Sequence, residues 1–432
     1  MIRRFVERGP ARAEGPVQPS ASFSAGGRHL SILTDTDRGR TILCEAQPEE
    51  RPWQRAPPGS PLELEHGGQV GGYGTFSFQY GPVAYGVQEA GAFKLATYGE
   101  RVVKAVPIVN YKKRGIEGRV AGMKPEDALL LLERSAGHFS ASYSTCFCTA
   151  VEDALGLDVP SRVLWDRAVA VELERIYNHV HVFAREAEAA SQNVAASQAN
   201  ALGERVLRLN AKYFGHRYLF GFGGVGTSSA DLGTQGRRRE LLAGARAVAG
   251  EFAGLMDGLL SSRIFLDRLQ GTARLSKEDA TRLGAVGPAA RGSGVEADDR
   301  HVYPAEPYHD IFVSLETERE GDSLARLTVR AREVQSSAMV LQELLDRMPP
   351  SGGVGSRGDG GEDFAICRTE GPSGDLIMAL GLDGQGRLAF LHVRPSSAAN
   401  WIPFAISLEG SVFTDFQFAY ESFGLSFADS DG

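Results

Sequence analysis

The chain has 432 residues, of which 42% are hydrophobic and 23% charged, and its formal net charge at pH 7 is −8. This acidic balance argues against general nucleic-acid binding, because phosphate contacts require a basic face. No apolar run approaches the roughly 18 to 20 residues of a membrane span, and the start MIRRFVERGPARAEG lacks the apolar core of a secretory signal. Four scattered cysteines are too few for a disulfide framework, so we expect a reduced, cytoplasmic location.

The N-terminal part is predicted to be separate from the rest. Within residues 1–70, RHLSILTDTDRGRTILCEA has two short apolar runs around an Asp/Gly turn, which is typical of a β hairpin. QPEERPWQRAPPGSP is rich in proline and indicates a linker. We therefore assign residues 1–70 to a β-containing segment with a proline-rich linker, and residues 71–432 to one larger domain.

The middle of the chain is predicted to be helical. After a second expected hairpin at 92–109, three segments carry apolar residues at alternating steps of three and four, within 169–183, 241–259 and 327–345. Such a seam, with a period near 3.5, predicts a long helix that cannot bury its apolar side alone. The simplest arrangement is a bundle of long, nearly antiparallel helices packed seam to seam.

Further helices are expected near 125–156 and 195–219, and both are expected to belong to the same bundle. Ser161, after Pro160, is a candidate N-cap for the first seam helix. Met348–Pro349–Pro350 is expected to end the third seam helix, because proline removes a backbone donor.

The C-terminal part returns to β structure. A glycine-rich loop at 351–363 precedes DFAICRTE and GDLIMALGLDGQGRLAFLHVRP, and the second of these predicts a hairpin around Asp383–Gly386. The predicted fold class is therefore α+β, a core bundle of long helices with β hairpins at both ends.

Two stretches resemble ligand sites only superficially. GFGGVG at 221–226 follows a helical stretch, whereas a dinucleotide loop must follow a strand, so we predict a glycine-rich helix–loop junction. His179 and His181 are two apart on a helix and face different directions, so they are not expected to share a metal ion.

The stretch GHFSASYSTCFC, residues 137–148, brings one histidine and two cysteines together in sequence. Cys146 and Cys148 point about 200° apart if the segment is helical, and a thiolate site usually draws three or four ligands. We predict that both are small core residues and that the chain has no metal site of its own. A metal site built from His138, Cys146 and Cys148 is the alternative.

From Gly81 onward, several motifs follow one another in a familiar order. They are GPVAYGVQEAGAFKL, NYKKRGIEG, ALLLLERSAGHFSAS, AVEDALGLDVP, VELERIYNHV, EGDSLARLTVRAREV and RTEGPSGDLIMAL. This series resembles the large subunit of membrane-bound, energy-converting nickel–iron (NiFe) hydrogenases of the formate-hydrogenlyase type. That group is homologous to the quinone-site subunit of NADH-quinone oxidoreductase (complex I). The resemblance covers roughly residues 75–432.

The resemblance implies a subunit of an oxidoreductase complex. Its partners would be a small iron–sulfur subunit, which holds the cluster, and membrane subunits. These partners would keep the chain peripheral at the inner face of the cell membrane.

The resemblance also implies where a metal would lie. In the hydrogenases the first ligand pair lies in a Glu-Arg-x-Cys-Gly-x-Cys motif, and here that stretch runs from Glu133 to Phe139 with Ala136 and Phe139 at the ligand positions. The second pair lies near the C-terminus, yet no cysteine follows Cys367. Ser373 stands where the hydrogenases have an active-site arginine. We therefore expect that the chain is not an active NiFe hydrogenase by itself.

Complex I suggests a different use of the vacated space, because its quinone-site subunit binds the quinone head there. The histidine that this subunit carries in a Gly-Pro-x-His context is missing, since Gly81–Pro82–Val83–Ala84 stands here, but other donors could hold a quinone carbonyl. His138 lies within the vacated motif and is either such a donor or a core histidine. Quinone is the one cofactor that the resemblance suggests for this chain.

Three further residues match family positions. Glu89, in EAGAF, matches a glutamate that transfers protons near the metal. An acid in an otherwise apolar cavity would have a raised pKa, which suits that role. Arg114 and Glu117 match an Arg-Gly-x-Glu motif and either belong to the site or form a structural ion pair.

Two functions follow. In the first, the chain is an electron-transfer subunit whose vacated cavity serves quinone binding or proton transfer. In the second, it is a non-catalytic scaffold retained for assembly of such a complex.

Overall fold

The computed structural model describes residues 63–64, 66, 68, 70–84, 87, 89–350 and 363–430. It describes the backbone alone of residues 17–25, 28–35, 40–45, 62 and 356–357. The predicted proline-rich linker lies outside the described residues.

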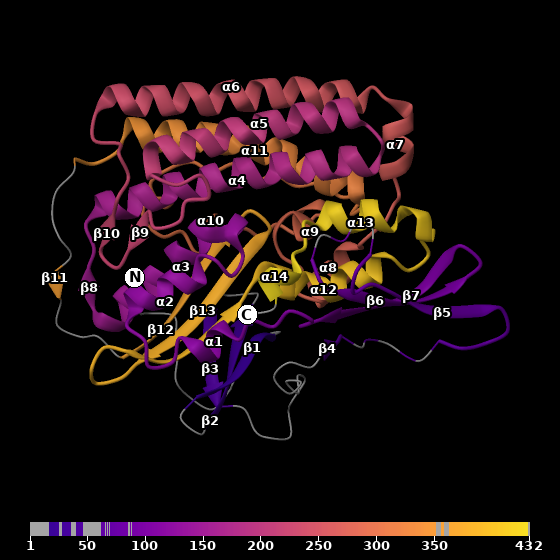
Figure 1. Ribbon diagram of the computed structural model, residues 1–432, viewed down its shortest axis with the longest axis horizontal. Helices are drawn as coiled ribbons and strands as arrows, with labels where there is room; N and C mark the ends of the chain where they lie inside the picture. Colours follow the sequence, from indigo (N-terminus) through magenta and orange to yellow (C-terminus); the bar gives the residue numbers. More distant parts are fainter. Residues whose placement is uncertain are drawn as a thin grey trace.

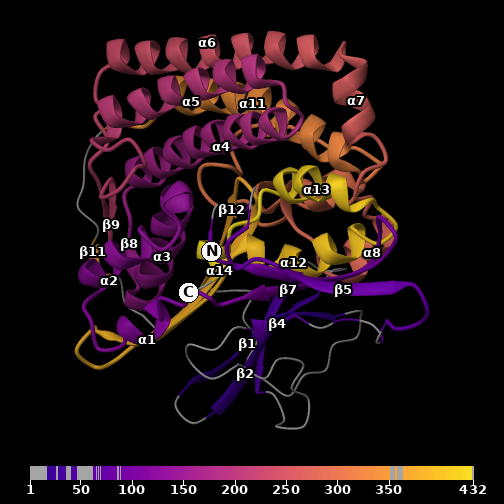
Figure 2. The same ribbon diagram turned by 45° about the vertical axis from the view of Figure 1, so that its right-hand side comes forward.

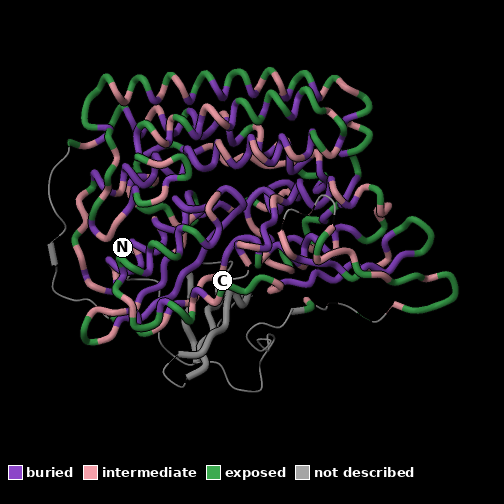
Figure 3. Tube along the Cα trace, viewed as in Figure 1, coloured by how far each residue is buried: buried purple, intermediate pink, exposed green. Residues whose placement is uncertain are grey.

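Four long helices form one side of the molecule and lie nearly parallel to one another (Figure 1). They are α4 (Ser161–Ala189), α5 (Asn193–Phe214), α6 (Gln235–Leu260) and α11 (Ser323–Asp346). The three predicted seams fall on α4, α6 and α11, so the bundle is confirmed. Helix α4 is buried on nearly all sides, whereas α6 exposes its outer face to solvent (Figure 3).

The predicted helix ends are partly right. Helix α11 ends at Asp346, just before Met348 and its two prolines, as expected. The prediction that Ser161 is an N-cap is wrong, because Ser161 is already the first helical residue and Pro160 occupies the cap position without a side-chain hydrogen bond. Proline fits there because its fixed φ leads the chain into the helix and the position needs no backbone donor.

A second core lies below α4. The helical stretch 125–156, expected in the bundle, lies outside it because its apolar residues pack on a sheet instead. It is also interrupted, forming α2 (Pro125–Leu132), a single 3₁₀ turn η2 (Gly137–Phe139) and α3 (Ser140–Leu155). Helix α3 packs on an antiparallel sheet of β12 (Phe364–Gly371), β13 (Gly374–Leu382) and β14 (Leu388–Arg394). The hairpin predicted around Asp383–Gly386 is the β13–β14 pair and is confirmed.

A third core lies between the bundle and another sheet. The strand order in this sheet is β4 (Leu62–Glu63), β7 (Arg101–Val109), β6 (Ala92–Tyr98), β5 (Thr75–Tyr80). The predicted hairpin at 92–109 is the β6–β7 pair. The short C-terminal helices α12 (Ser396–Ser407), α13 (Phe416–Phe423) and α14 (Phe427–Ser430) pack between this sheet and the bundle (Figure 2).

The N-terminal backbone forms a three-stranded antiparallel sheet of β1 (Val17–Ala25), β2 (Arg28–Asp35) and β3 (Arg40–Glu45). Its β2–β3 pair is the hairpin expected from the sequence. The division between residues 1–70 and 71–432 stays a prediction.

The remaining elements are short. They are α1 (Ile116–Arg119), β8 (Leu157–Asp158), β9 (Gly223–Gly224), β10 (Thr227–Ser228), α7 (Arg263–Leu269), α8 (Lys277–Arg282), α9 (Gly287–Gly292), α10 (Asp299–Val302), η3 (Phe413–Asp415) and β11 (Ser356–Arg357). GFGGVG lies between α5 and α6, so it follows a helix and not a strand, as predicted, but it is not a plain loop because it contains the two-residue strand β9.

The described architecture confirms the α+β fold class, with a helical core and hairpins toward both ends. In the part of the chain that the structure describes, no helix combines the length and the apolar composition that crossing a bilayer requires.

Candidate functional site

The metal-motif stretch forms the turn between α2 and α3. Glu133 is fully buried, and both of its carboxylate oxygens accept from the backbone N–H of Gly221 at 3.0 Å. Arg114 donates to the carbonyls of Arg134 (3.3 Å) and Ser135, so it fixes the backbone directly before Ala136. The motif frame is therefore a buried and well-tethered turn.

At the two positions that the resemblance equates with metal ligands, this turn carries side chains without donor atoms. Ala136 is 2% exposed and Phe139 is 5% exposed. Neither a methyl group nor a phenyl ring offers a lone pair to a soft metal. Among the described residues, no group of three or more His, Cys, Asp or Glu side chains is placed to hold a metal ion. Ala136 and Phe139 therefore do not fit the role of nickel–iron ligands.

The cysteines lie in the core behind the turn. Cys146 and Cys148 are fully buried in α3, and the Cys146 thiol faces the carbonyl of Cys367 on β12 at 3.5 Å. Burial raises the pKa of Cys148 to about 12, so its thiol stays protonated. The placement of Cys146 and Cys148 as core residues is confirmed.

His138 is anchored through its backbone. The side-chain amide of Asn178 donates to the His138 carbonyl at 2.8 Å, and the imidazole packs on the ring of Phe139 with centroids 4.1 Å apart. Burial, together with the nearby His181, lowers the pKa of His138 to about 4. The imidazole is therefore neutral at pH 7.

The two histidines of α4, His179 and His181, have separate environments, as their spacing predicted. His179 is fully buried and its Nε2 lies 2.7 Å from Glu333, whereas His181 packs its ring on Tyr177 with centroids 6.0 Å apart.

A small cavity lies beside the turn, between α3, the β12–β13 turn and the C-terminal helix α14. It has room for about one water molecule. Its polar lining consists of hydroxyl groups and one carboxyl group, from Ser142, Tyr143, Ser373, Ser396 and Asp429. A quinone ring is several times larger than a water molecule and does not fit the cavity in this form.

Two residues of the cavity lining, Tyr143 and Asp429, are linked by hydrogen bonds to Ser426 and through it to Glu89, and we call these four residues the C-terminal cluster. The Tyr143 hydroxyl donates to Asp429 at 2.6 Å. Glu89 accepts from the Ser426 hydroxyl at 3.1 Å and from the backbone N–H of Ala428 at 2.8 Å. The cluster ties the end of the chain to α3 and to the EAGAF segment.

Glu89 thus differs from the sequence-based expectation in its surroundings. The sequence predicts an otherwise apolar cavity around it, but it is held by a hydroxyl and a backbone donor of the C-terminal segment. The strongly shifted acid is its neighbour, since burial raises the pKa of Asp429 to about 6 and the charge of Glu89 adds to this shift.

A second shifted acid holds the start of α3. Glu174 is buried on α4 and accepts from the backbone N–H groups of Ala141 (2.6 Å) and Ser142 (3.0 Å), and also from the Ser142 hydroxyl. Burial raises its pKa to about 7, although these hydrogen bonds oppose the shift. Ser142 also lines the cavity, so Glu174 contacts a residue of the cavity wall while Asp429 lines the cavity directly.

The remaining predicted residues are divided between the cavity and its surroundings. Ser373 lines the cavity and its hydroxyl donates to the Gly424 carbonyl at 3.3 Å. Glu117 accepts from the backbone of Val393 at 2.9 Å and pairs with His392 at 3.1 Å, beside β14. Arg114 holds the motif turn instead, so these two residues support different parts of the structure.

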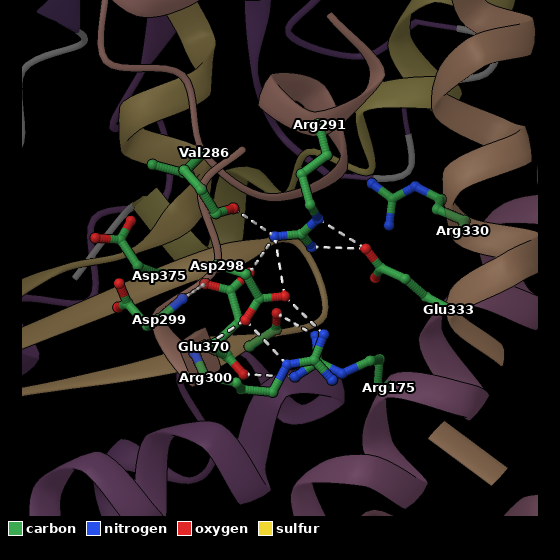
Figure 4. Close-up of polar contacts among 12 residues, drawn as sticks. Arg175, Val286, Arg291, Asp298, Asp299, Arg300, Arg330, Glu333, Glu370 and Asp375 are labelled. Carbon is green, nitrogen blue, oxygen red and sulfur yellow. Dashed lines mark hydrogen bonds and ion pairs between the residues drawn. The ribbon is translucent and has the colours of Figure 1, made fainter. Parts of the chain in front are cut away.

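A cluster of buried charged residues lies next to the β12–β13 turn, which forms part of the cavity wall. Figure 4 shows the contacts within this ion cluster. Arg291 contacts Glu333 and Glu370, each at 2.8 Å, and all three are at most 5% exposed. Arg175 donates to the carbonyls of Glu370 (2.7 Å) and Gly371 (2.9 Å), at the β12–β13 turn that lines the cavity. The other members are Glu172, Asp298 and Arg300.

Two acids of the ion cluster have pKa values that are shifted in opposite directions. Burial alone would raise the pKa of Glu333, but Arg291 and the hydrogen bond from His179 hold it well below its ordinary value. Burial and the charge of Asp298 raise the pKa of Glu370 to about 8, although Arg291 opposes that shift. The sequence analysis did not single out this cluster.

The fold agrees with the resemblance to the large subunits of hydrogenases and to their counterpart in complex I. It combines a bundle of long helices, hairpin sheets and a buried motif turn. A family model described as the 49 Kd subunit of respiratory-chain NADH dehydrogenase matches residues 197–359. The family resemblance drawn from the sequence motifs is therefore confirmed.

Individual relatives agree with this class. Membrane-bound hydrogenase subunit alpha of Pyrococcus furiosus is 26% identical over 360 residues, which are 79% of this chain and 84% of the relative. An NADH-quinone oxidoreductase subunit of Salinibacter ruber is 27% identical over 350 residues, 73% of this chain and 76% of the relative. A chain in the structure of the membrane-bound sulfane sulfur reductase, an archaeal respiratory membrane complex, shares the fold. Its TM-score is 0.76 at 23% identity, covering 83% of this chain and 98% of that one.

Proposed function

We propose that this chain is a peripheral subunit of a membrane-associated respiratory complex. In that complex it would dock on a small iron–sulfur subunit and on membrane subunits at the inner face of the cell membrane. The support is its likeness to a membrane-bound hydrogenase subunit and to a subunit of NADH-quinone oxidoreductase. Its own contribution would be proton transfer at the vacated metal motif, without a nickel–iron centre.

The observation that carries this role is the C-terminal cluster. Asp429, with a pKa of about 6, can give up and regain a proton near neutral pH at low cost. Its carboxyl accepts from the Tyr143 hydroxyl and faces a cavity that has room for about one water molecule. A proton released by Asp429 can pass to that water, and Glu89, which accepts from Ser426 and from Ala428 at the start of α14, would be the neighbouring proton carrier.

Quinone binding is the weaker form of this proposal. The cavity would have to enlarge, and its wall is the β12–β13 turn that Arg175 ties to the buried ion cluster. Quinone entry would therefore require this support to move.

A scaffold role is the second candidate function, and the buried ion cluster favours it. Arg291, Glu333 and Glu370 join α9, α11 and β12 through fully desolvated contacts, which are sensitive to geometry and suit a rigid support. In this role the chain would hold its partners in place without moving protons.

The test is Asp429→Asn in the purified complex. If Asp429 transfers protons, electron-transfer turnover should fall by about 10²-fold, because a positioned acid–base group typically contributes that much. The pH dependence near pH 6 should disappear, since the amide does not titrate. Glu89→Gln and Tyr143→Phe should also slow turnover, and to a smaller extent.

Asp415→Asn is the matched control, because Asp415 pairs with Arg268 at 3.5 Å and does not line the cavity. Full turnover in all three cluster variants, with the complex assembled, would refute the proton role. If deletion of the chain then abolishes assembly, the scaffold role remains. Tight binding of a quinone analogue that Ser373→Trp abolishes would favour the quinone form.

A further inference from the structure

A buried glutamate of the helix bundle has no partner. Glu186 lies near the C-terminal end of α4, and its side chain is completely buried. Among the described residues, none donates a hydrogen bond to either of its carboxylate oxygens. A buried carboxylate without donors is strongly unfavourable, so Glu186 holds a proton in this form. Burial accordingly raises the pKa of Glu186 well above its ordinary value.

Two buried arginines lie near this glutamate. Arg326 and Arg330 stand on α11, which packs on α4, and both are at most 1% exposed. Burial lowers the pKa of Arg326 to about 9 and that of Arg330 to about 10, and the charge of Glu186 is among those that oppose both shifts. Within the described residues, the two guanidiniums contact only carbonyls, hydroxyls and the neutral imidazole of His179. Two buried cations and an acid that could neutralise them are therefore close together but not in contact.

The arginines bind the C-terminal part of the chain instead. Arg326 donates to the Ser422 hydroxyl at 2.9 Å and lies over the ring of Phe423, 4.2 Å from its centroid. Arg330 donates to the carbonyls of Ser422 (3.4 Å) and Phe423 (2.8 Å). A Cβ at Gly424 would lie 2.6 Å from Nη2 of Arg330, so the approach is as close as a residue without a side chain allows. The two arginines therefore fix residues 422–424.

Residues 422–424 hold one side of the cavity in turn. The Gly424 carbonyl accepts at 3.3 Å from the hydroxyl of Ser373, which lines the cavity. Ser426 and Asp429 of the C-terminal cluster follow a few residues later in the chain. Release of residues 422–424 would therefore free a wall of the cavity together with the proposed proton carrier.

We propose that Glu186 is a proton-controlled switch for the segment 422–430. When its proton passes to water, the carboxylate can pair with Arg326 and Arg330, because guanidinium bonds to a carboxylate are stronger than those to carbonyls. No described donor reaches its oxygens in the present form, so the guanidiniums must turn away from residues 422–424 to make these bonds. The segment is then released and the cavity opens. This inference gives the proposed function a gate, and it rests on that function only for its effect on turnover.

Two further acids face Glu186 and oppose its ionisation. Glu421 on α13 pairs with Arg185 at 2.9 Å, and Asp322 caps α11 by accepting from the backbone N–H groups of Ala325 and Gly271, each at 2.8 Å. The charges of Glu421 and Asp322 add to the effect of burial on the pKa of Glu186. The ionised form thus depends on pairing with the arginines, which couples loss of the proton to release of the segment.

The test measures hydrogen exchange in the full chain by mass spectrometry, as protection factors of the backbone amides in residues 422–430. The closed form binds one more proton than the open form, so opening increases as pH rises. Protection should fall about tenfold between pH 7.5 and 8.5. Asp429 and Glu421, with pKa values of about 6 and about 7, are already ionised in this range. Glu186→Gln cannot ionise, so its protection should be high and independent of pH.

Glu188→Gln is the matched control, because Glu188 lies on the same helix with its side chain 54% exposed. This variant should show the pH dependence of the wild type. Ser422→Ala removes the acceptor of Arg326 and should lower protection at every pH while keeping the pH dependence. Circular dichroism checks that each variant is folded.

Three results would overturn the inference. They are constant protection of the wild type over this pH range, a wild-type pH dependence in Glu186→Gln, and unchanged protection in Ser422→Ala. None of these measurements involves turnover, so failure of the switch is distinguishable from failure of proton transfer by Asp429.

Discussion

Replacing Arg291 with methionine is expected to lower the free energy of unfolding by about 3–5 kcal/mol, which chemical denaturation would measure. Arg291 is fully buried and contacts Glu333, Glu370 and Asp298 at 2.8, 2.8 and 3.4 Å. Methionine approximates its length, so the main loss is the positive charge. The three acids would then share a desolvated space with less compensation.

The pH dependence of this loss has a definite sign. Without Arg291, the pKa values of Glu333 and Glu370 rise in the folded state, so the folded variant binds protons more readily than the unfolded chain. Stability from such groups is present at low pH and is lost as pH rises through the folded pKa. The deficit of Arg291→Met should therefore be smaller at pH 5 than at pH 8.

A surface arginine provides the control for this prediction. Arg205 contacts Glu251 at 2.7 Å, but their side chains are 41% and 58% exposed. Arg205→Met should cost less than about 1 kcal/mol, because exposed pairs contribute little. Arg291→Lys keeps the charge and should lose less free energy of unfolding than Arg291→Met. Equal losses for Arg205→Met and Arg291→Met would show that the buried contacts do not stabilise the fold.

The bundle was predictable because it depends on local repetition. Apolar residues that return every three or four positions define a buried stripe, whatever the rest of the chain does. The same repetition placed α4, α6 and α11. The break between α2 and α3 was missed, because residues 133–136 leave the helix to satisfy the contact of Glu133 with Gly221, which lies far along the chain.

The ion cluster had a sequence signal that was not used. Glu172 and Arg175 of the cluster are three residues apart on α4, and the buried His179 follows four residues later. On α11 the buried Arg326 and Arg330 precede Glu333 of the cluster with steps of four and three. Charged residues with the period of a helix, within segments that also carry an apolar seam, indicate charges that face the interior. Their partners on β12 and in the 291–300 segment still could not be predicted, because that pairing depends on tertiary structure.

The candidate site was only half predictable for the same reason. The motif frame from Glu133 to Phe139 and Glu89 came from the resemblance, and the structure places both near one cavity. Tyr143 and Asp429 are 286 residues apart, and nothing in either local sequence indicates that they meet. The decisive acid of the proposed function is thus a residue that only the fold reveals.

Gly91→Ala is expected to detach the C-terminal segment and to lower the free energy of unfolding by about 2–3 kcal/mol, measured by denaturation. A Cβ at residue 91 would lie 2.2 Å from the ring of Phe427, far inside contact distance. Phe427 is fully buried and stacks on Trp401 at 4.5 Å, so its ring has little room to move. The ring must leave its place, and α14 moves with it.

Detachment of α14 has a functional consequence that separates it from a simple loss of stability. Asp429 and the partners of Glu89 lie on or beside α14, so Gly91→Ala should also reduce turnover of an assembled complex and remove its pH dependence near pH 6. Truncating the ring removes the clash, so Gly91→Ala should cost little more when Phe427→Ala is already present. Strict additivity of the two substitutions would mean that Gly91 and Phe427 act separately, and the proposed packing of the C-terminal segment against EAGAF would be wrong.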